Sequence, residues 1–95
     1  MLEGWPFIDP PDLAVITVAQ VLRGALPILY VAHDEDDGGW QFLTGEAVEV
    51  SDAMVVGLGE IVEHDPSLAE LADLPTGWCA TRADRLSAWV RARGV

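Results

Sequence analysis

Two short apolar segments joined by a loop of acids and glycines place the strongest constraint on how this chain folds. Pro27–Ala32 is apolar and rich in β-formers, and Trp40–Thr44 alternates so that its aromatic side chains share one face. The intervening segment, His33–Gly39, has the composition of a hairpin loop. We therefore expect an antiparallel strand pair at the centre of a β-sheet.

The segment before this hairpin predicts a lead-in, a strand and a short helix. Residues 1–12 contain three prolines, which block regular pairing and predict an irregular lead-in. Leu13–Thr17 is apolar and β-branched, as in a buried strand, and Thr17 could cap a helix over Val18–Arg23 that Gly24 ends. One longer helix from Asp12 is the alternative, because periodicity over so few residues is ambiguous.

The second half of the chain predicts further short elements. We expect a strand over Met54–Leu58, one or two helical turns over Gly59–His64, and a short strand over Gly77–Ala80. Asp65 followed by Pro66 predicts a helix that runs to about Ala72. A basic final helix over about 82–93 is predicted from an apolar side formed by Ala83, Leu86, Trp89 and Val90.

These elements predict a single α+β domain over residues 13–95. Its sheet is expected to be small and mostly antiparallel, with the hairpin at its centre and two to three short helices packed on it. A length of 95 residues suits one domain, and a 51% hydrophobic content is enough for a core.

Charge is distributed unevenly along the chain. Residues 1–81 contain fifteen acids and one base, Arg23, whereas residues 82–95 contain four arginines and one acid, and the formal net charge is −11. Such a surface repels phosphate, which argues against nucleic-acid binding. It favours rapid association with a basic protein. The basic C-terminal segment is expected to dock on the acidic body of its own chain, with docking on a second copy as the alternative.

Other sequence features indicate where the protein acts. Cys79 is the only cysteine, so an intrachain disulfide is excluded and a reducing compartment is compatible. The first residues lack the basic and apolar regions of a signal peptide, and Arg23, Gly24 and Pro27 interrupt the apolar stretch that follows. We expect a cytoplasmic protein that does not cross a membrane.

Catalytic, cofactor-binding and metal-binding residues are not predicted. His33 and His64 lack a paired metal-ligand spacing, and Cys79 has no recognisable base partner, so we interpret it as a buried structural thiol. The acidic run Asp34–Asp37 does not have the spacing of a calcium loop and is interpreted as a solvated turn. The alternative is a metal-dependent or hydrolytic enzyme built on this loop and His33.

Several motifs resemble a bacterial family first described as a domain of unknown function and later grouped with the immunity proteins of polymorphic toxin systems, as family 33. The resemblance covers about residues 13–82. The matching features are an opening strand that ends near Thr17, followed by Pro27–Tyr30, Asp36–Glu46, the region from Val56 to Ile61, Asp65–Leu68, Leu74–Gly77 and Arg82. It implies a small cytoplasmic binding protein without enzymatic activity, which neutralises a toxin by binding it.

The resemblance and the acidic body together predict a surface that recognises a basic protein. We assign to it the acids of the hairpin loop, the aromatic residue that follows the loop, and two acids beyond the second strand: Asp34, Glu35, Asp36, Asp37, Trp40, Glu46 and Glu49. The alternative function is that of a homo-oligomeric structural or regulatory domain, in which the partner is a second copy, as in a homodimer.

Overall fold

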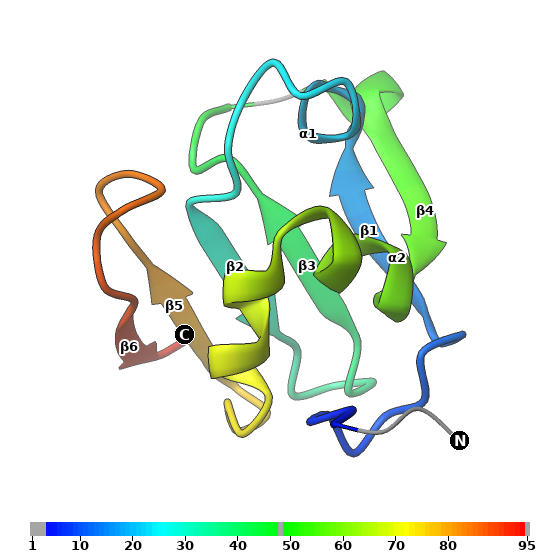
Figure 1. Ribbon diagram of the computed structural model, residues 1–95, viewed down its shortest axis with the longest axis vertical. Helices are drawn as coiled ribbons and strands as arrows, with labels where there is room; N and C mark the ends of the chain where they lie inside the picture. The colour runs from blue at the N-terminus through cyan, green and yellow to red at the C-terminus, as the bar shows by residue number, and fades with distance from the viewer. Residues whose placement is uncertain (1–3, 48, 95) are drawn as a thin grey trace.

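The computed structural model describes residues 4–47 and 49–94 and contains one six-stranded sheet (Figure 1). The strands lie in the order β4-β1-β3-β2-β5-β6. Their bounds are Ala14–Val18 (β1), Tyr30–His33 (β2), Trp40–Leu43 (β3), Ala53–Gly57 (β4), Trp78–Thr81 (β5) and Val90–Arg93 (β6). Only β1 and β3 are parallel, and every other neighbouring pair is antiparallel. This confirms the predicted α+β fold with a mostly antiparallel sheet.

Helical segments pack on one face of the sheet. The α-helix α2 (Leu58–His64) and the 3₁₀ helix η2 (Pro66–Leu71) cross this face, as Figure 1 shows, whereas α1 (Ala19–Leu22) and the 3₁₀ turn η1 (Val50–Asp52) lie at its end. Apolar residues of these segments meet inward-facing strand residues and form the core. Its largest fully buried side chains are those of Ile28, Phe42, Leu58, Ile61, Leu68, Leu71 and Leu74.

The predicted hairpin is confirmed as the centre of the sheet. β2 and β3 pair antiparallel, with Tyr30 opposite Leu43 and His33 opposite Trp40. The turn is closed by the Asp34 amide, which donates to the Gly39 carbonyl at 2.7 Å. Gly38 has a φ of 71°, a conformation that side chains with a Cβ rarely adopt. The glycines of this loop therefore serve the turn itself.

The strand and the short helix predicted before the hairpin also agree with the structure, except for one cap; residues 1–3 of the predicted lead-in lie outside the described residues. β1 followed by α1 rules out a single long helix from Asp12, and Gly24, with a φ of 75°, ends the helical segment. Thr17, however, does not cap α1. It lies inside β1, and its hydroxyl donates to the Phe42 carbonyl at 2.8 Å. The residue that precedes the helix is Val18, whose side chain makes no capping hydrogen bond.

The predicted basic helix over 82–93 is wrong. Residues 83–89 form turns and irregular backbone, and Val90–Arg93 is an edge strand that pairs with β5. The Asp84 carboxylate accepts hydrogen bonds from the Leu86 amide and the Ser87 hydroxyl, which offers the backbone an alternative to a helix. Strand β6 instead pairs with the outer edge of β5, and its backbone groups form hydrogen bonds with those of β5.

Arg82 also opposes a helix at this position because its side chain points into the protein. The guanidinium donates to the Asp65 carboxylate at 2.7 Å, to the Ser67 hydroxyl at 2.9 Å and to the Ile28 carbonyl at 3.0 Å. The Trp89 ring lies 4.2 Å from its central carbon. The arginine therefore ties β5, η2 and the C-terminal loop together.

Asp65 is the second half of this cluster. It caps η2 by accepting a hydrogen bond from the Ser67 amide, as the sequence predicted for this position. Burial raises the pKa of its carboxyl, but hydrogen bonds from Ser67 and Arg82, together with the charge of Arg82, outweigh burial, so the pKa lies below 3.8. The pair is thus held in its charged form.

This lowered pKa predicts a loss of stability in acid. The folded carboxyl binds a proton less readily than the unfolded one, so its contribution is fully present above about pH 4–5 and is lost as the pH falls through the folded pKa. We expect the gap in unfolding free energy between wild type and Asp65→Asn to narrow from about pH 6 to about pH 2. Urea titrations at several pH values measure it, and a constant gap would contradict the prediction.

Candidate functional site: the open face of the sheet

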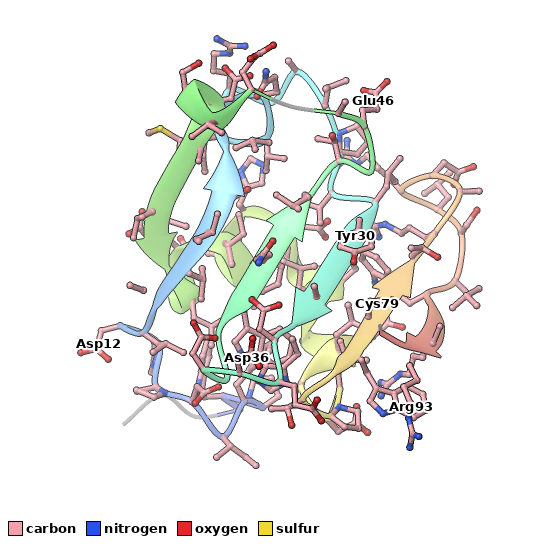
Figure 2. All side chains as sticks on the ribbon, turned by 180° about the vertical axis from the view of Figure 1, so that it is seen from behind. Asp12, Tyr30, Asp36, Glu46, Cys79 and Arg93 are labelled. Atoms are coloured by element: carbon pink, nitrogen blue, oxygen red, sulfur yellow. The ribbon has the colours of Figure 1, made fainter. Side chains whose placement is uncertain are left out.

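The face of the sheet opposite α2 and η2 is not covered by any helix among the described residues. Figure 2 views the molecule from this side, with the strands in front of the helices. Strand pairing places alternate residues of β1, β2, β3, β4 and β5 on it. We call this surface the open face, and its central residues are Ile16, Tyr30, Ala32, Gln41, Val55 and Cys79. Ile16 is 42% exposed and Val55 is 70% exposed.

A shallow groove of about 340 Å³ lies on the open face beside the hairpin turn. Tyr30, Ala32 and Cys79 form part of its lining, and acids of the turn form another part. Burial raises the pKa of the Tyr30 phenol, and contact with Cys79 and the charge of Asp34 raise it further. The phenol therefore stays neutral and offers a hydroxyl beside apolar surface.

The hairpin loop places acids at one end of the open face. The Asp34 carboxylate accepts a hydrogen bond from the Gln41 side chain at 2.9 Å, so it lies on the open face itself. Asp37 accepts a hydrogen bond from the Gly39 amide at 2.8 Å and thereby shapes the turn. Glu35 and Asp36 are exposed, and Figure 2 labels Asp36 at this end of the sheet. We call Asp34–Asp37 the acidic turn.

Trp40 does not belong to this surface, contrary to the sequence-based assignment. It is 2% exposed, and its ring stacks on His33 with the ring centroids 3.9 Å apart. Its indole nitrogen donates to the Asp9 carboxylate at 3.0 Å. Strand alternation turns Trp40 and Phe42 toward the helices, whereas Gln41 between them faces outward. Trp40 therefore packs in the core and offers a partner almost no surface.

Glu46 and Glu49 lie away from the acidic turn. Both are exposed, but they follow β3 at its far end, and Figure 2 shows Glu46 and Asp36 at opposite ends of the sheet. Glu49 precedes η1, and its amide donates to the Asp52 carboxylate at 3.3 Å. The predicted acids thus do not form one patch. They flank the open face at two ends.

The open face itself was missed by sequence analysis. Cys79 was expected to be buried, but it is partly exposed and lies next to Tyr30. A signal was present at the start of β1, where apolar residues occupy consecutive positions from Leu13 to Ile16 instead of alternating with polar ones. Such a strand has two apolar faces, and only tertiary structure shows that one of them is left open.

Both ring nitrogens of His33 lie within hydrogen-bonding distance of backbone carbonyl oxygens, which indicates a structural role for this side chain. One ring nitrogen lies 2.8 Å from the Leu74 carbonyl oxygen and the other lies 3.2 Å from the Gly38 carbonyl oxygen. The ring therefore connects β2 to the segment before β5 and to the hairpin turn. Within residues 4–47 and 49–94, no group of three or more histidine, cysteine, aspartate or glutamate side chains is arranged to hold a metal ion.

Comparisons with known proteins identify no relative. A scan against protein-family models finds no match, and searches of curated proteins and of solved structures find none either. The resemblance to immunity proteins therefore stays an expectation. In the part of the chain that the structure describes, no helix is long and apolar enough to span a membrane.

Proposed function

We propose that this protein is a small, acidic, non-enzymatic binding protein of the cytoplasm, and that it neutralises a basic toxin or effector by covering part of its surface. The open face would provide the contact area, and the acidic turn would orient the partner. The observation that carries the proposal is an apolar sheet surface, with Ile16 and Val55 exposed, beside a dense group of acids.

The composition of this surface suits a protein partner. Apolar side chains supply the area that becomes buried on binding, and acids at the rim speed the encounter with a basic surface. Glu35 and Asp36 are well placed for this role because both are exposed and precede the part of the turn that Asp37 stabilises. Resemblance to immunity proteins supports the same reading.

The charge distribution in the fold weakens the case for a homo-oligomer built on the C-terminal segment. Two of its four arginines are paired within the chain: Arg82 with Asp65 and Arg91 with Asp73, each at 2.7 Å. The helix that would have docked on a second copy is instead strand β6. These two contacts support intramolecular docking of the C-terminal segment, the version that the sequence favoured.

Reversing charge in the acidic turn is expected to slow association with the partner. The test variant is Glu35→Lys with Asp36→Lys, which leaves the hydrogen bonds of Asp34 and Asp37 in place. A tagged wild-type protein first captures its partner from lysate of its source at low salt, and association rates are then measured by surface plasmon resonance. We expect about a tenfold slower rate, with the difference shrinking as salt is added.

A matched control reverses two exposed acids of the helical layer, Glu63→Lys with Glu70→Lys, which changes net charge equally on the other side. It should associate at close to the wild-type rate. A third variant, Ile16→Ser, should weaken binding by faster dissociation. Equal rates for all variants would overturn the open face as the binding site. Relief of the partner's toxicity by wild type but not by Ile16→Ser would establish neutralisation.

A further inference from the structure

Strand β4 is an edge strand of the sheet that lacks the usual protection against pairing. Within the described residues it pairs with β1 alone. Its sequence, Ala53–Gly57, contains no charged residue and no proline. Natural edge strands commonly carry lysine, proline or a bulge, which discourage the addition of another strand. An unprotected edge is therefore a feature that requires an explanation.

The register identifies which backbone groups are free. The Leu58 amide donates to the Leu13 carbonyl, so antiparallel alternation directs the Val56 and Met54 backbone groups toward β1 and those of Val55 away from it. The Gly57 amide points the same way and is occupied by the Glu60 carboxylate at 3.3 Å. The N–H and C=O of Val55 thus face outward at the middle of the edge.

Side chains at this edge also leave room for a neighbour. Val55 is 70% exposed and belongs to the open face, because it lies opposite Ile16. Met54 is 41% exposed. A strand added beside β4 would extend the open face without a break and would cover both side chains.

The opposite edge of the sheet shows the contrast. β6 carries Arg91 and Arg93, and Arg91 is held by the Asp73 carboxylate and by the Glu70 carbonyl. Charged side chains of this kind deter a further strand. The two edges therefore differ, and only β4 is suited to strand addition.

The charged residues at the two ends of β4 indicate which kind of strand could pair with it. Glu49 and Asp52 precede the strand, Glu60 follows it, and Asp12 lies against Gly57. A second copy paired antiparallel through β4 would bring the acids before one strand close to the acids after the other, in two chains of net charge −11 each. A segment with basic residues at its ends would instead be attracted at both.

We propose that β4 accepts an extended basic segment of the partner as a seventh strand, so that the partner binds both the edge and the adjoining open face. This inference rests on the proposed function for the existence of a basic partner. The added strand would bond to the backbone of Val55, and its apolar side chains would pack beside Val55 and Met54. Its basic ends would lie near Asp52 and Glu60.

The test uses the whole protein and a short synthetic peptide with lysines at both ends and alternating valine and threonine between them. Nuclear magnetic resonance follows the peptide titration and hydrogen exchange at the Val55 amide. We expect saturable binding that slows this exchange at least about tenfold. A peptide methylated on alternate backbone nitrogens keeps its charge but loses strand donors, and it should bind at least about tenfold more weakly.

Variants of the edge separate it from the rest of the surface. Val55→Lys places a charge on the edge and should abolish peptide binding, whereas Val90→Lys adds the same charge to an exposed valine on β6 and should preserve it. Val55→Pro removes the outward N–H, which an edge strand tolerates, and should also prevent binding.

Three results would overturn the inference. The first is equal binding of the methylated and unmodified peptides, since charge alone would then suffice. The second is capture of the natural partner by Val55→Lys at wild-type strength, after which Ile16→Ser still tests the remainder of the open face. The third is slowed Val55 exchange without peptide that grows with protein concentration, which identifies a second copy as the occupant. Peptide binding at β4 with partner capture unaffected by Ile16→Ser would instead contradict the proposed function.

Discussion

Replacing Arg82 by methionine is expected to lower the free energy of unfolding by about 3–5 kcal/mol, because the change leaves a largely buried carboxylate without its cation. The Arg82 side chain is 2% exposed and that of Asp65 is 19% exposed. The Ile28 carbonyl and the Ser67 hydroxyl would also lose a donor. Urea denaturation followed by circular dichroism measures the effect.

Arg91→Met provides the matched control, since it removes the same functional group from the same chain segment. Its partner Asp73 is 82% exposed, so water replaces the lost contact and little change is expected. Asp65→Asn combined with Arg82→Met should be less harmful than the sum of the two single changes. Equal effects of Arg82→Met and Arg91→Met would contradict the structural role assigned to Arg82.

Replacing Trp40 by alanine is expected to cost about 3–5 kcal/mol of unfolding free energy, the range for a large aromatic side chain removed from a core. The ring packs edge-on against Phe7, with centroids 5.4 Å apart, and stacks on Phe42 and His33. Its hydrogen bond to Asp9 holds the lead-in segment against the sheet. The variant should therefore also loosen the segment that contains Phe7.

Two further variants calibrate this result. Trp40→Phe keeps an aromatic ring but loses the indole N–H, and it should cost less than Trp40→Ala. Leu86→Ala, at a residue that is 98% exposed, should change the unfolding free energy by less than about 0.5 kcal/mol. Unchanged stability of Trp40→Ala together with lost partner capture would restore Trp40 to the recognition surface.

The variants Arg82→Met and Trp40→Ala also help to distinguish effects on stability from effects on partner binding. Neither Arg82 nor Trp40 is exposed enough to take part in a contact with a partner. Loss of binding that accompanies loss of stability in either variant would therefore report partial unfolding. The open-face variant Ile16→Ser and the edge variant Val55→Lys change exposed side chains instead. These are the substitutions that test binding in a folded protein.

Local signals in the sequence determined much of the fold. Glycines and acids between two β-forming segments determined the hairpin, because those residue types favour a tight turn and the flanking ones an extended backbone. Asp65 followed by Pro66 determined where η2 begins, since the carboxylate satisfies a free amide there. These interactions span only a few residues, and the structure confirms them.

Only the tertiary structure decided the secondary structure of residues 82–93 and which face of the sheet is left uncovered. An apolar periodicity over 82–93 favoured a helix, but the buried contacts of Arg82 and the pairing of β6 with β5 depend on residues distant in sequence, and they prevailed. Likewise, alternation along β3 predicts that Trp40 and Gln41 point to opposite faces of the sheet. Which of the two faces the helices cover depends on tertiary packing. The acids were visible in the sequence, whereas the open face between them exists because helices cover one side of the sheet and, among the residues that the structure describes, leave the other side uncovered.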